Sequence, residues 1–206
     1  MEIRWCILED LEMKCRFCNT ELAQLVVDLG TSPLSNAFLE ETSLDKKEPF
    51  YPLRVYVCHE CFLVQLGDNV QPPKEIFSKY LYFSSYSTTW LKHAKDLANE
   101  IIKKFDCDQN TNVIEIASND GYLLQHFKDN NIPSLGIEPA TNVAKIAEER
   151  GIKTVNKFFG LDTANDLKES GNQADILLAI NVLPHVPDLH DFLKGIKVIL
   201  KSDGIL

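Results

Sequence analysis

Residues 112–127 read NVIEIASNDGYLLQHF, and they give the clearest indication of the fold class. Its first six residues, NVIEIA, are mostly apolar and predict a strand. The short polar loop SNDG (118–121) follows, and residues 121–130 are predicted to form a helix. A strand that runs through such a loop into a helix is typical of an open α/β sheet, which binds its ligands at the carboxyl ends of its strands.

The second half of the chain repeats this alternation of strand and helix. Further strands are predicted over SLGIE (134–138), KTV (153–155), ADILLAINVL (174–183) and the opening GIL (204–206). Helices are predicted over 141–150, closed by Gly151, over 161–170, ending at Gly171, and over 188–201. Alternation at this spacing indicates βαβ units with right-handed crossovers, so the fold class is α/β with a parallel sheet.

The segment ADILLAI (174–180) is apolar at nearly every position. This composition predicts a strand that is covered on both faces in the middle of the sheet, because at an edge it would promote aggregation. The last predicted strand has only begun where the sequence stops. We therefore expect this chain to be the front part of a longer protein.

A longer helix is predicted over 87–105, with Ser87 or Thr88 as its N-cap. Apolar residues recur there at spacings of three and four, namely Leu91, Ala94, Ala98, Ile101 and Phe105. Lysines and other polar residues occupy the opposite face. The helix is therefore expected to bury one side.

The first part of the chain contains short apolar runs separated by turns. Strands are predicted over LAQLVVDLG (22–30), ended by Gly30, over YPLRVYVCHEC (51–61) and over FLVQLGD (62–68). Pro72-Pro73 cannot continue a strand or a helix interior and marks a boundary. We expect one domain over 1–75, with 1–12 as a poorly ordered leader before Met13, and a second over 76–206.

Four of the six cysteines form two pairs, Cys15-x-x-Cys18 and Cys58-x-x-Cys61. Each C-x-x-C turn delivers two sulfurs, and zinc takes four thiolates tetrahedrally, so the pattern predicts a structural Zn²⁺ without Lewis-acid activity. Two alternatives are reduced cysteines at accidental spacing and a redox pair. His59 is interpreted as a residue of the turn and not as a fifth ligand. Cys6 and Cys107 are interpreted as inert thiols.

The composition is that of a globular protein, with 206 residues, 45% of them hydrophobic and 25% charged. The 21 basic and 30 acidic side chains give a net charge of −9, which disfavours a nucleic-acid binder. No apolar stretch approaches the ~20 residues that span a bilayer, so no membrane association is expected. The N-terminus is unlike a signal peptide, and a cytoplasmic location is predicted.

Two acids flank the predicted ligand loop, which contains a single glycine, Gly121. NAD is disfavoured because its pyrophosphate requires two further glycines. Glu115 lies near the end of the first strand and Glu138 ends the second, where an acid can bind ribose hydroxyls. An acid-flanked pocket suits the positively charged S-adenosylmethionine (SAM). Another nucleotide, or a loop with solvated acids, remains open.

Taken together, these stretches resemble the family of deoxysugar C-methyltransferases, which transfer a methyl group from SAM to a carbon of a nucleotide-linked keto-hexose. The similar stretches are CRFCNTEL, DLGTSPLSNAFL, YPLRVYVCHECFLVQL, EIASNDGYLLQHF, GIEPATNVAKIAEERGIKTVNKFF and NVLPHVPDLHDFLKGIKVILKSDG, within residues 13–204. The resemblance implies a zinc-binding domain followed by a Rossmann-like SAM-binding domain, of which about four strands are present. It also implies a C-terminal domain that lies outside this chain.

The resemblance also implies a set of cofactor-binding residues. The methionine and ribose portions would contact Glu115, Ala117, Ser118, Asn119, Gly121 and Tyr122, and Glu138 would hold the ribose hydroxyls beside Pro139. Phe158 and Phe159 would flank the adenine, unless they only pack in the core. The family usually has glycine at the position of Ala117, whose extra methyl group could crowd the cofactor.

Candidate residues for the reaction centre follow from the same resemblance. Asn181 and His185 come after the fourth strand, and KYLYFSSYS (79–87) is similar to a family segment that closes over cofactor and sugar. Tyr80, Tyr82 and Ser84 are therefore candidates, with aromatic packing as the alternative. His185 or a tyrosine could stabilise the enolate oxygen that forms when a base removes the proton beside the ketone.

The family's Glu-His element, its best-known catalytic feature, matches no position in residues 1–206. We therefore expect weak SAM binding and no turnover from this chain alone. Three rival functions are a non-catalytic nucleotide-sugar or protein binding module, a zinc-ribbon nucleic-acid binder and an NAD-dependent sugar enzyme. The charge opposes the second and the sparse glycine loop opposes the third.

Overall fold

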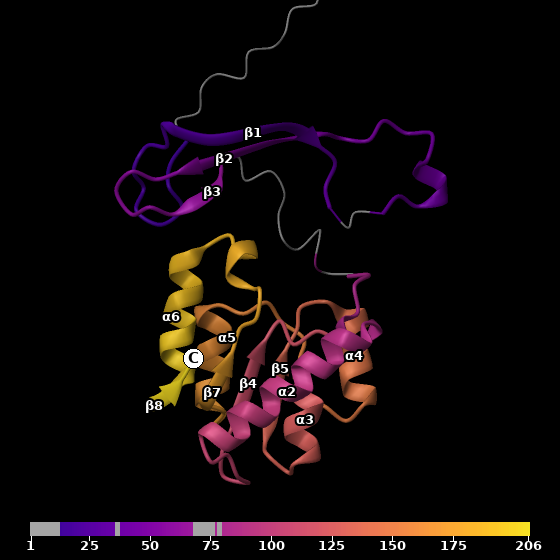
Figure 1. The fold of residues 1–206 in the computed structure, drawn as a ribbon, viewed down its shortest axis with the longest axis vertical. Coiled ribbons are helices and arrows are strands. Elements are labelled where there is room, and N and C mark those ends of the chain that lie inside the picture. Colours follow the sequence, from indigo (N-terminus) through magenta and orange to yellow (C-terminus); the bar gives the residue numbers. More distant parts are fainter. Residues whose placement is uncertain (1–12, 36–37, 68–76, 78–79) are drawn as a thin grey trace, which may run out of the picture. The chain divides into compact units, whose positions relative to one another are not determined.

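The structure is a computed structural model that describes residues 13–35, 38–67, 77 and 80–206 (Figure 1). The chain divides into two compact units, Met1–Gln71 (unit 1) and Pro72–Leu206 (unit 2). The predicted leader, Cys6 and Pro72-Pro73 lie outside the described residues. Within the part that is described, no helix is long and apolar enough to cross a membrane.

Unit 1 contains a three-stranded antiparallel sheet in the order β1-β2-β3. Its strands are β1 (Gln24–Ser32), β2 (Tyr51–Val57) and β3 (Val64–Leu66), with the short 3₁₀ helix η1 (Glu41–Ser43) between the first two. The prediction that Gly30 ends the first strand is wrong. Gly30 has a φ of 77° and lies at a register shift between Asp28 and Thr31, so it forms a bulge and the strand continues to Ser32.

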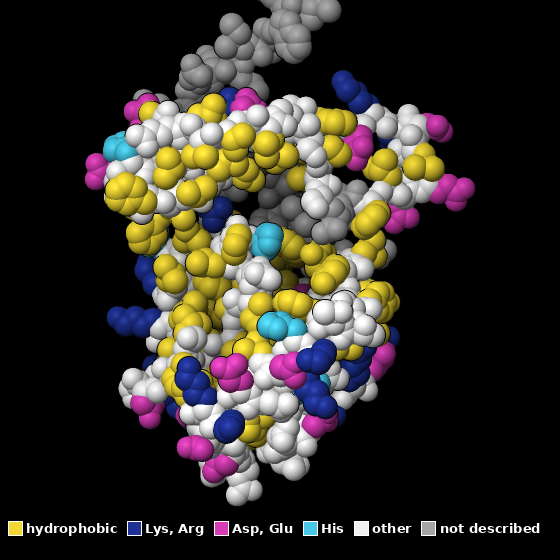
Figure 2. All heavy atoms as spheres, viewed as in Figure 1, with side chains coloured by type: hydrophobic (Ala, Val, Ile, Leu, Met, Phe, Trp, Pro, Cys, Tyr) yellow, Lys and Arg dark blue, Asp and Glu magenta, His cyan; other side chains and the backbone are white. Residues whose placement is uncertain are grey.

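The core of unit 1 is small. Its buried apolar cluster consists of Cys15, Leu22, Tyr56 and Cys58. Strand β1 leaves large side chains exposed, for example Leu29 at 64%. Figure 2 shows apolar side chains gathered on the visible surface of this unit. Burial alone therefore stabilises unit 1 weakly.

Unit 2 is built on a five-stranded parallel sheet in the order β6-β5-β4-β7-β8, which confirms the predicted fold class. The strands are β4 (Val113–Ile116), β5 (Ser134–Ile137), β6 (Thr154–Val155), β7 (Ala174–Leu178) and β8 (Leu200–Ile205). The apolar strand β7 pairs with β4 on one side and β8 on the other, as its composition predicts.

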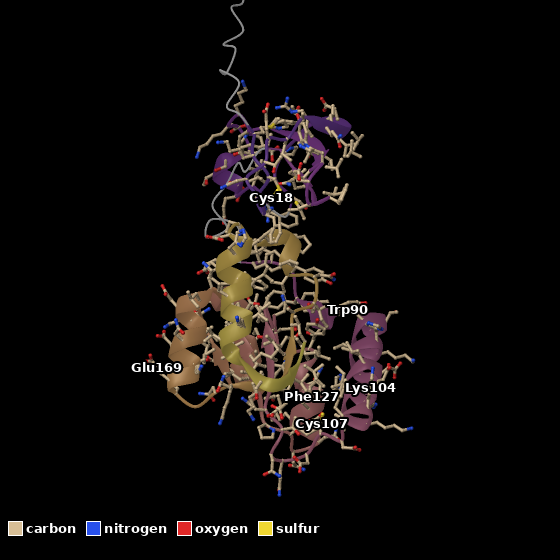
Figure 3. All side chains as sticks on the ribbon, turned by 90° about the vertical axis from the view of Figure 1, so that its left-hand side faces the viewer. Cys18, Trp90, Lys104, Cys107, Phe127 and Glu169 are labelled. Atoms are coloured by element: carbon tan, nitrogen blue, oxygen red, sulfur yellow. The ribbon has the colours of Figure 1, made fainter. Side chains whose placement is uncertain are left out.

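Helices cover both faces of this sheet (Figure 1). They are α2 (Thr88–Lys104), α3 (Leu124–Asp129), α4 (Thr141–Glu149), α5 (Leu161–Glu169) and α6 (Leu189–Ile199), with 3₁₀ helices η2 (Ser84–Tyr86) and η3 (Leu183–His185). One buried cluster joins α2, α3 and α4 to the sheet and contains Phe127, labelled in Figure 3. A second joins α5 and α6 to the other face.

Several element ends differ from the prediction. Helix α3 begins at Leu124 and not at Gly121, whose φ of 77° is not helical. Strand β7 ends at Leu178 because the chain then turns through Asn181, with φ 56°. Helix α6 ends at Ile199, and β8 begins at Leu200 instead of Gly204, because the extended Leu200 already pairs with β7. The N-cap Ser87 is confirmed, since its Oγ accepts the Trp90 N–H at 3.2 Å.

Candidate functional site

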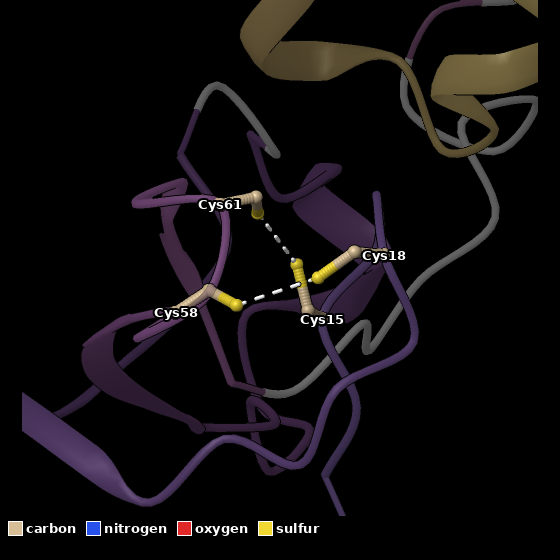
Figure 4. A group of neighbouring side chains, drawn as sticks. All are labelled: Cys15, Cys18, Cys58 and Cys61. Atoms are coloured by element: carbon tan, nitrogen blue, oxygen red, sulfur yellow. Dashed lines mark hydrogen bonds between the residues drawn. The ribbon is translucent and has the colours of Figure 1, made fainter.

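The four cysteines of unit 1 converge on one point (Figure 4). All four Sγ atoms lie within 4.8 Å of one another, and the pairs Cys15–Cys61 and Cys18–Cys58 are each 3.5 Å apart. A tetrahedral zinc ion with Zn–S bonds of about 2.3 Å separates its sulfurs by about 3.8 Å. The cluster therefore fits a Cys₄ zinc ion.

The two cysteine turns have the same backbone geometry. Asn19 donates its N–H to the Cys15 carbonyl at 3.0 Å, and Phe62 donates to the Cys58 carbonyl at 3.0 Å. Both donors follow the second cysteine of their pair and have left-handed backbones, with φ of 62° and 60°. Because both turns share this geometry, the two sulfurs of each pair are oriented in the same way relative to their turn.

Polar contacts favour the metal-binding thiolate form of Cys15. Burial raises the pKa of the Cys15 thiol, but hydrogen-bond donors, among them the Gln65 amide at 3.2 Å, lower it to about 6. His59 has its Nε2 3.7 Å from the Glu60 carboxylate and is not part of the sulfur cluster. This placement agrees with its interpretation as a residue of the turn.

A cavity of about 440 Å³ lies in unit 2 at the carboxyl ends of β4, β5 and β7. It is lined by twelve of the residues that the sequence singles out, namely Tyr80, Tyr82, Ser84, Ala117, Asn119, Tyr122, Glu138, Pro139, Phe158, Phe159, Asn181 and His185. The structure therefore brings together residues that are distant in sequence. Its size suits a nucleoside ligand.

Three predicted cofactor contacts lie behind this lining. Glu115 is 1% exposed and points from β4 into the core, while Ser118 is fully buried and packs against Gly136. Gly121 has a left-handed backbone, and a Cβ there would lie 2.9 Å from Ile152. These three residues shape the loop and do not line the cavity.

Glu138 is the acid at the wall of the cavity. It follows β5 and is only 5% exposed. Its Oε2 accepts the Asn119 N–H at 2.9 Å, and its Oε1 accepts the Ala140 N–H at 2.8 Å. Burial raises the pKa of this carboxyl, although the two N–H donors oppose the shift. The carboxylate is thus fixed in one orientation, which suits the binding of ribose hydroxyls.

Tyr122 lies beside both Trp90 and Glu115. The ring centroids of Tyr122 and Trp90 are 5.9 Å apart, and both Tyr122 and Glu115 are buried. Burial and the neighbouring Glu138 raise the pKa of Glu115 well above its ordinary value. Burial and Glu115 also raise the pKa of Tyr122. Packing beside Trp90 holds the Tyr122 ring at the cavity wall.

Several lining residues were missed by the sequence analysis, including Phe77, Trp90, Val186 and Phe192. Trp90 and Lys104 mark the two ends of α2 in Figure 3. Trp90 lies four residues before Ala94, on the apolar face of this helix, and this spacing could have revealed it. Phe192 likewise lies on the apolar face of α6, three residues after Leu189, whereas Phe77 and Val186 come from segments without a periodic signal.

Ala117 has a φ of 56°, a left-handed conformation that costs a residue with a Cβ roughly 1–2 kcal/mol. It lies at the turn after β4 and lines the cavity. Glycine adopts such a backbone without this cost, which agrees with the glycine that the family resemblance implies at this position.

Family profiles match both units. One family, described as a methyltransferase domain, matches residues 90–206, more than half of the chain. The chain belongs to this family. A second family, described as a candidate zinc-binding domain, matches residues 15–77. These matches and the cysteine cluster support the two predicted cofactors, SAM and Zn²⁺.

One curated relative is the C-methyltransferase NovU of Streptomyces niveus, 27% identical over 192 residues, which are 93% of this chain and 46% of NovU. The chain thus spans about half the length of this relative. Among solved structures, the YcgJ protein of Bacillus subtilis is 19% identical with a TM-score of 0.44, over 55% of this chain and 48% of YcgJ. A SAM-dependent methyltransferase of Thiobacillus denitrificans in complex with S-adenosyl-L-homocysteine is 16% identical with a TM-score of 0.42, over 55% and 46%.

Proposed function

We propose that this chain is the zinc-containing, SAM-binding part of a C-methyltransferase that acts on a nucleotide-linked keto-sugar. The observation that carries the proposal is Glu138, a buried carboxylate held by two backbone N–H groups at the wall of the cavity. The family of residues 90–206 and the C-methyltransferase NovU support the type of reaction. The keto-sugar substrate is inferred from the resemblance to the deoxysugar C-methyltransferases.

Glu138 is proposed to hold the ribose of the cofactor. Each of its oxygens accepts one backbone N–H and retains a lone pair that can accept a hydroxyl group. Ile137, Phe158 and Phe159 supply apolar walls beside it for the adenine. No phosphate group is needed for this arrangement, which agrees with a single-glycine loop.

When bound, SAM supplies an electrophilic methyl group on a positively charged sulfonium sulfur. The aromatic faces of Tyr82, Trp90 and Tyr122 line the cavity and attract a cation. The Trp90 ring, 5.9 Å from the Tyr122 ring between centroids, keeps the Tyr122 ring in place. These residues are proposed to bind and orient the charged end of the cofactor.

The sugar is proposed to bind where Asn181 and His185 meet the tyrosines. Asn181 follows β7 and His185 ends η3, and both line the cavity with Tyr80 and Tyr82. Their N–H and O–H groups can donate to a keto oxygen as negative charge develops on it. We propose that the base that removes the sugar proton belongs to the Glu-His element, so that residues 1–206 bind SAM without turnover.

The location is proposed to be cytoplasmic. The described cysteines are free thiols, and four of them form the metal cluster. A reducing compartment keeps such thiols available for zinc, which supports this location.

Calorimetry of the zinc-loaded chain tests SAM binding. SAM and S-adenosylhomocysteine should bind and NAD should not. Glu138→Gln should weaken SAM binding about 10-fold or more, because hydrogen bonds to a charged group contribute about 1.5–3 kcal/mol. The matched control is Glu169→Gln at the exposed end of α5, which should bind as the wild type does. NAD binding without SAM binding would contradict the proposal.

A second experiment tests the reaction. The chain is incubated with methyl-labelled SAM and a nucleotide-linked 4-keto sugar, and the sugar is analysed for label. No labelled sugar is expected from residues 1–206. A methylated sugar would show that these residues contain a complete catalytic site, contrary to the proposal.

A further inference from the structure

One wall of the cavity is a segment without strand pairing. Residues 80–86, called the strap below, carry Tyr80, Tyr82 and Ser84 into the cavity lining. Among the described residues the strap belongs to no strand, and only η2 gives it regular structure. A segment of this kind needs other partners for its backbone N–H and carbonyl groups.

Asn142 supplies two of these partners. It lies in the first turn of α4, and its Oδ1 accepts the Tyr80 N–H at 3.1 Å. Its Nδ2 donates to the Tyr80 carbonyl at 2.7 Å. One amide side chain thus satisfies both backbone groups of Tyr80, as a neighbouring strand would.

Asn119 makes a second pair of side-chain hydrogen bonds to the strap backbone. Its Oδ1 accepts the Ser84 N–H at 2.9 Å, and its Nδ2 donates to the Tyr82 carbonyl at 3.1 Å. The backbone N–H of Asn119 donates to Glu138 at 2.9 Å. Asn119 therefore connects the strap to the carboxylate that is proposed to hold the cofactor ribose.

A third attachment is an ion pair at the end of the strap. The Asp120 carboxylate is fully buried, lies 3.2 Å from Arg150 Nη1 and accepts the Ser85 N–H at 3.3 Å. The Ser85 hydroxyl also donates to Asp120 and accepts from Arg150 Nη2 at 3.0 Å. A buried carboxylate that loses such partners is costly, so this attachment is strong.

We infer that Asn119, Asn142 and the Asp120–Arg150 pair are positioning residues that hold Tyr80 and Tyr82 in place at the cofactor pocket. This inference rests on the proposed function, which makes the cavity a SAM pocket. It gives Asn119 a role different from the cofactor contact that the resemblance implies. Its amide oxygen and amide nitrogen both already bind the strap.

The test combines amide exchange by NMR with SAM titration on the zinc-loaded 206-residue chain. Asn142→Ala should accelerate exchange of the Tyr80 amide about tenfold or more and weaken SAM binding about 3- to 10-fold. The exchange rates of the β4 and β7 amides and the melting temperature of unit 2 should be unchanged. A general loss of stability would change both. Asn165→Ala on the exposed face of α5 is the matched control and should resemble the wild type.

Ser85→Ala is an independent variant, because Ser85 does not line the cavity. It should accelerate exchange at the Ser85 amide and weaken SAM binding in the same direction, even if Asn142→Ala fails to fold. If the Tyr80 and Ser85 amides exchange faster in these two variants but SAM affinity stays at the wild-type value, the positioning role is overturned. If these amides exchange at the wild-type rate, the hydrogen bonds proposed to attach the strap are overturned. Wild-type chain that binds no SAM, but whose strap loosens in the variants, would support the attachments and overturn the proposed function.

Discussion

Unit 1 and unit 2 are stabilised in different ways. The buried cluster of unit 1 contains four residues, and two of them are the metal-binding residues Cys15 and Cys58. Unit 2 has two larger clusters, one on each face of its sheet. Burial of apolar surface can stabilise unit 2, but unit 1 leaves most of β1 exposed.

This difference indicates that metal binding supplies the folding free energy of unit 1. Structural zinc contributes about 10–16 kcal/mol in zinc-finger peptides, and two of the four buried residues of unit 1 belong to the metal cluster itself. Unit 2 needs no metal for its core. A perturbation of one unit should therefore leave the other folded.

The largest effect is expected from Cys58→Ser. The variant removes a fully buried zinc ligand, so zinc content should fall well below one per chain and unit 1 should lose its amide protection. Elemental analysis and hydrogen exchange measure both. Cys107→Ser, outside the cluster, is the control and should retain zinc. Full zinc content in Cys58→Ser would contradict the assignment.

Phe127→Ala should have the next largest effect, confined to unit 2. Phe127 is fully buried between α3 and the sheet, and removing it should lower the free energy of unfolding of unit 2 by about 3–5 kcal/mol. Urea unfolding followed by Trp90 fluorescence, with Trp5→Phe as background, measures this loss. Phe38→Ala, at an exposed site, should change it by less than about 0.5 kcal/mol. A change in zinc content would show that the units are coupled.

Glu115→Gln should change how the stability of unit 2 depends on pH. The pKa of Glu115 is raised in the folded state, so its contribution to stability is full below about 4.5 and is lost as pH rises through the folded pKa. Glutamine does not ionise, so the variant should gain stability over the wild type as pH rises above about 4.5. Urea unfolding between pH 4.5 and 8 measures the difference. Glu169→Gln should show the same dependence of stability on pH as the wild type. The same result for Glu115→Gln would contradict the raised pKa of Glu115.

Ala117→Gly should have the smallest effect, a small gain in the stability of unit 2. Glycine relieves the left-handed backbone at φ 56°, so unit 2 should gain up to about 1 kcal/mol of stability. Ala144→Gly in α4 is the matched control and should lose about 1 kcal/mol or more, because its backbone is helical. Thermal unfolding of both variants gives the comparison. Destabilisation by Ala117→Gly would show that its Cβ packs favourably.

The sequence predicted the regular parts of both units because their signals are local. Two C-x-x-C pairs indicated the metal cluster, and alternating apolar runs indicated the parallel sheet. Helix α2 was predicted nearly to its ends, since Ser87 is a strong N-cap.

Two of the errors fell where backbone conformation depends on distant partners. Gly30 occupies a bulge because β2 pairs on both sides of it, and Leu200 is extended because it pairs with β7. Neither pairing strand can be predicted from the local sequence around Gly30 or Leu200.

The candidate site shows the same limit. The position of Glu138 at the site could be predicted, because it directly follows a strand. The hydrogen bonds of the Asn119 and Asn142 amides to the strap backbone could not be predicted. Asn142 lies 62 residues from Tyr80, and only the fold brings them together. Side chains that bind irregular backbone leave no periodic signal.

The central claim is that zinc holds unit 1 and burial holds unit 2. Residue-level hydrogen exchange before and after removal of zinc with a chelator tests it most directly. The amides of β1, β2 and β3 should lose their protection, while those of β4, β5 and β7 should keep theirs. Protection of unit 1 without zinc, or loss of protection in both units together, would contradict the claim.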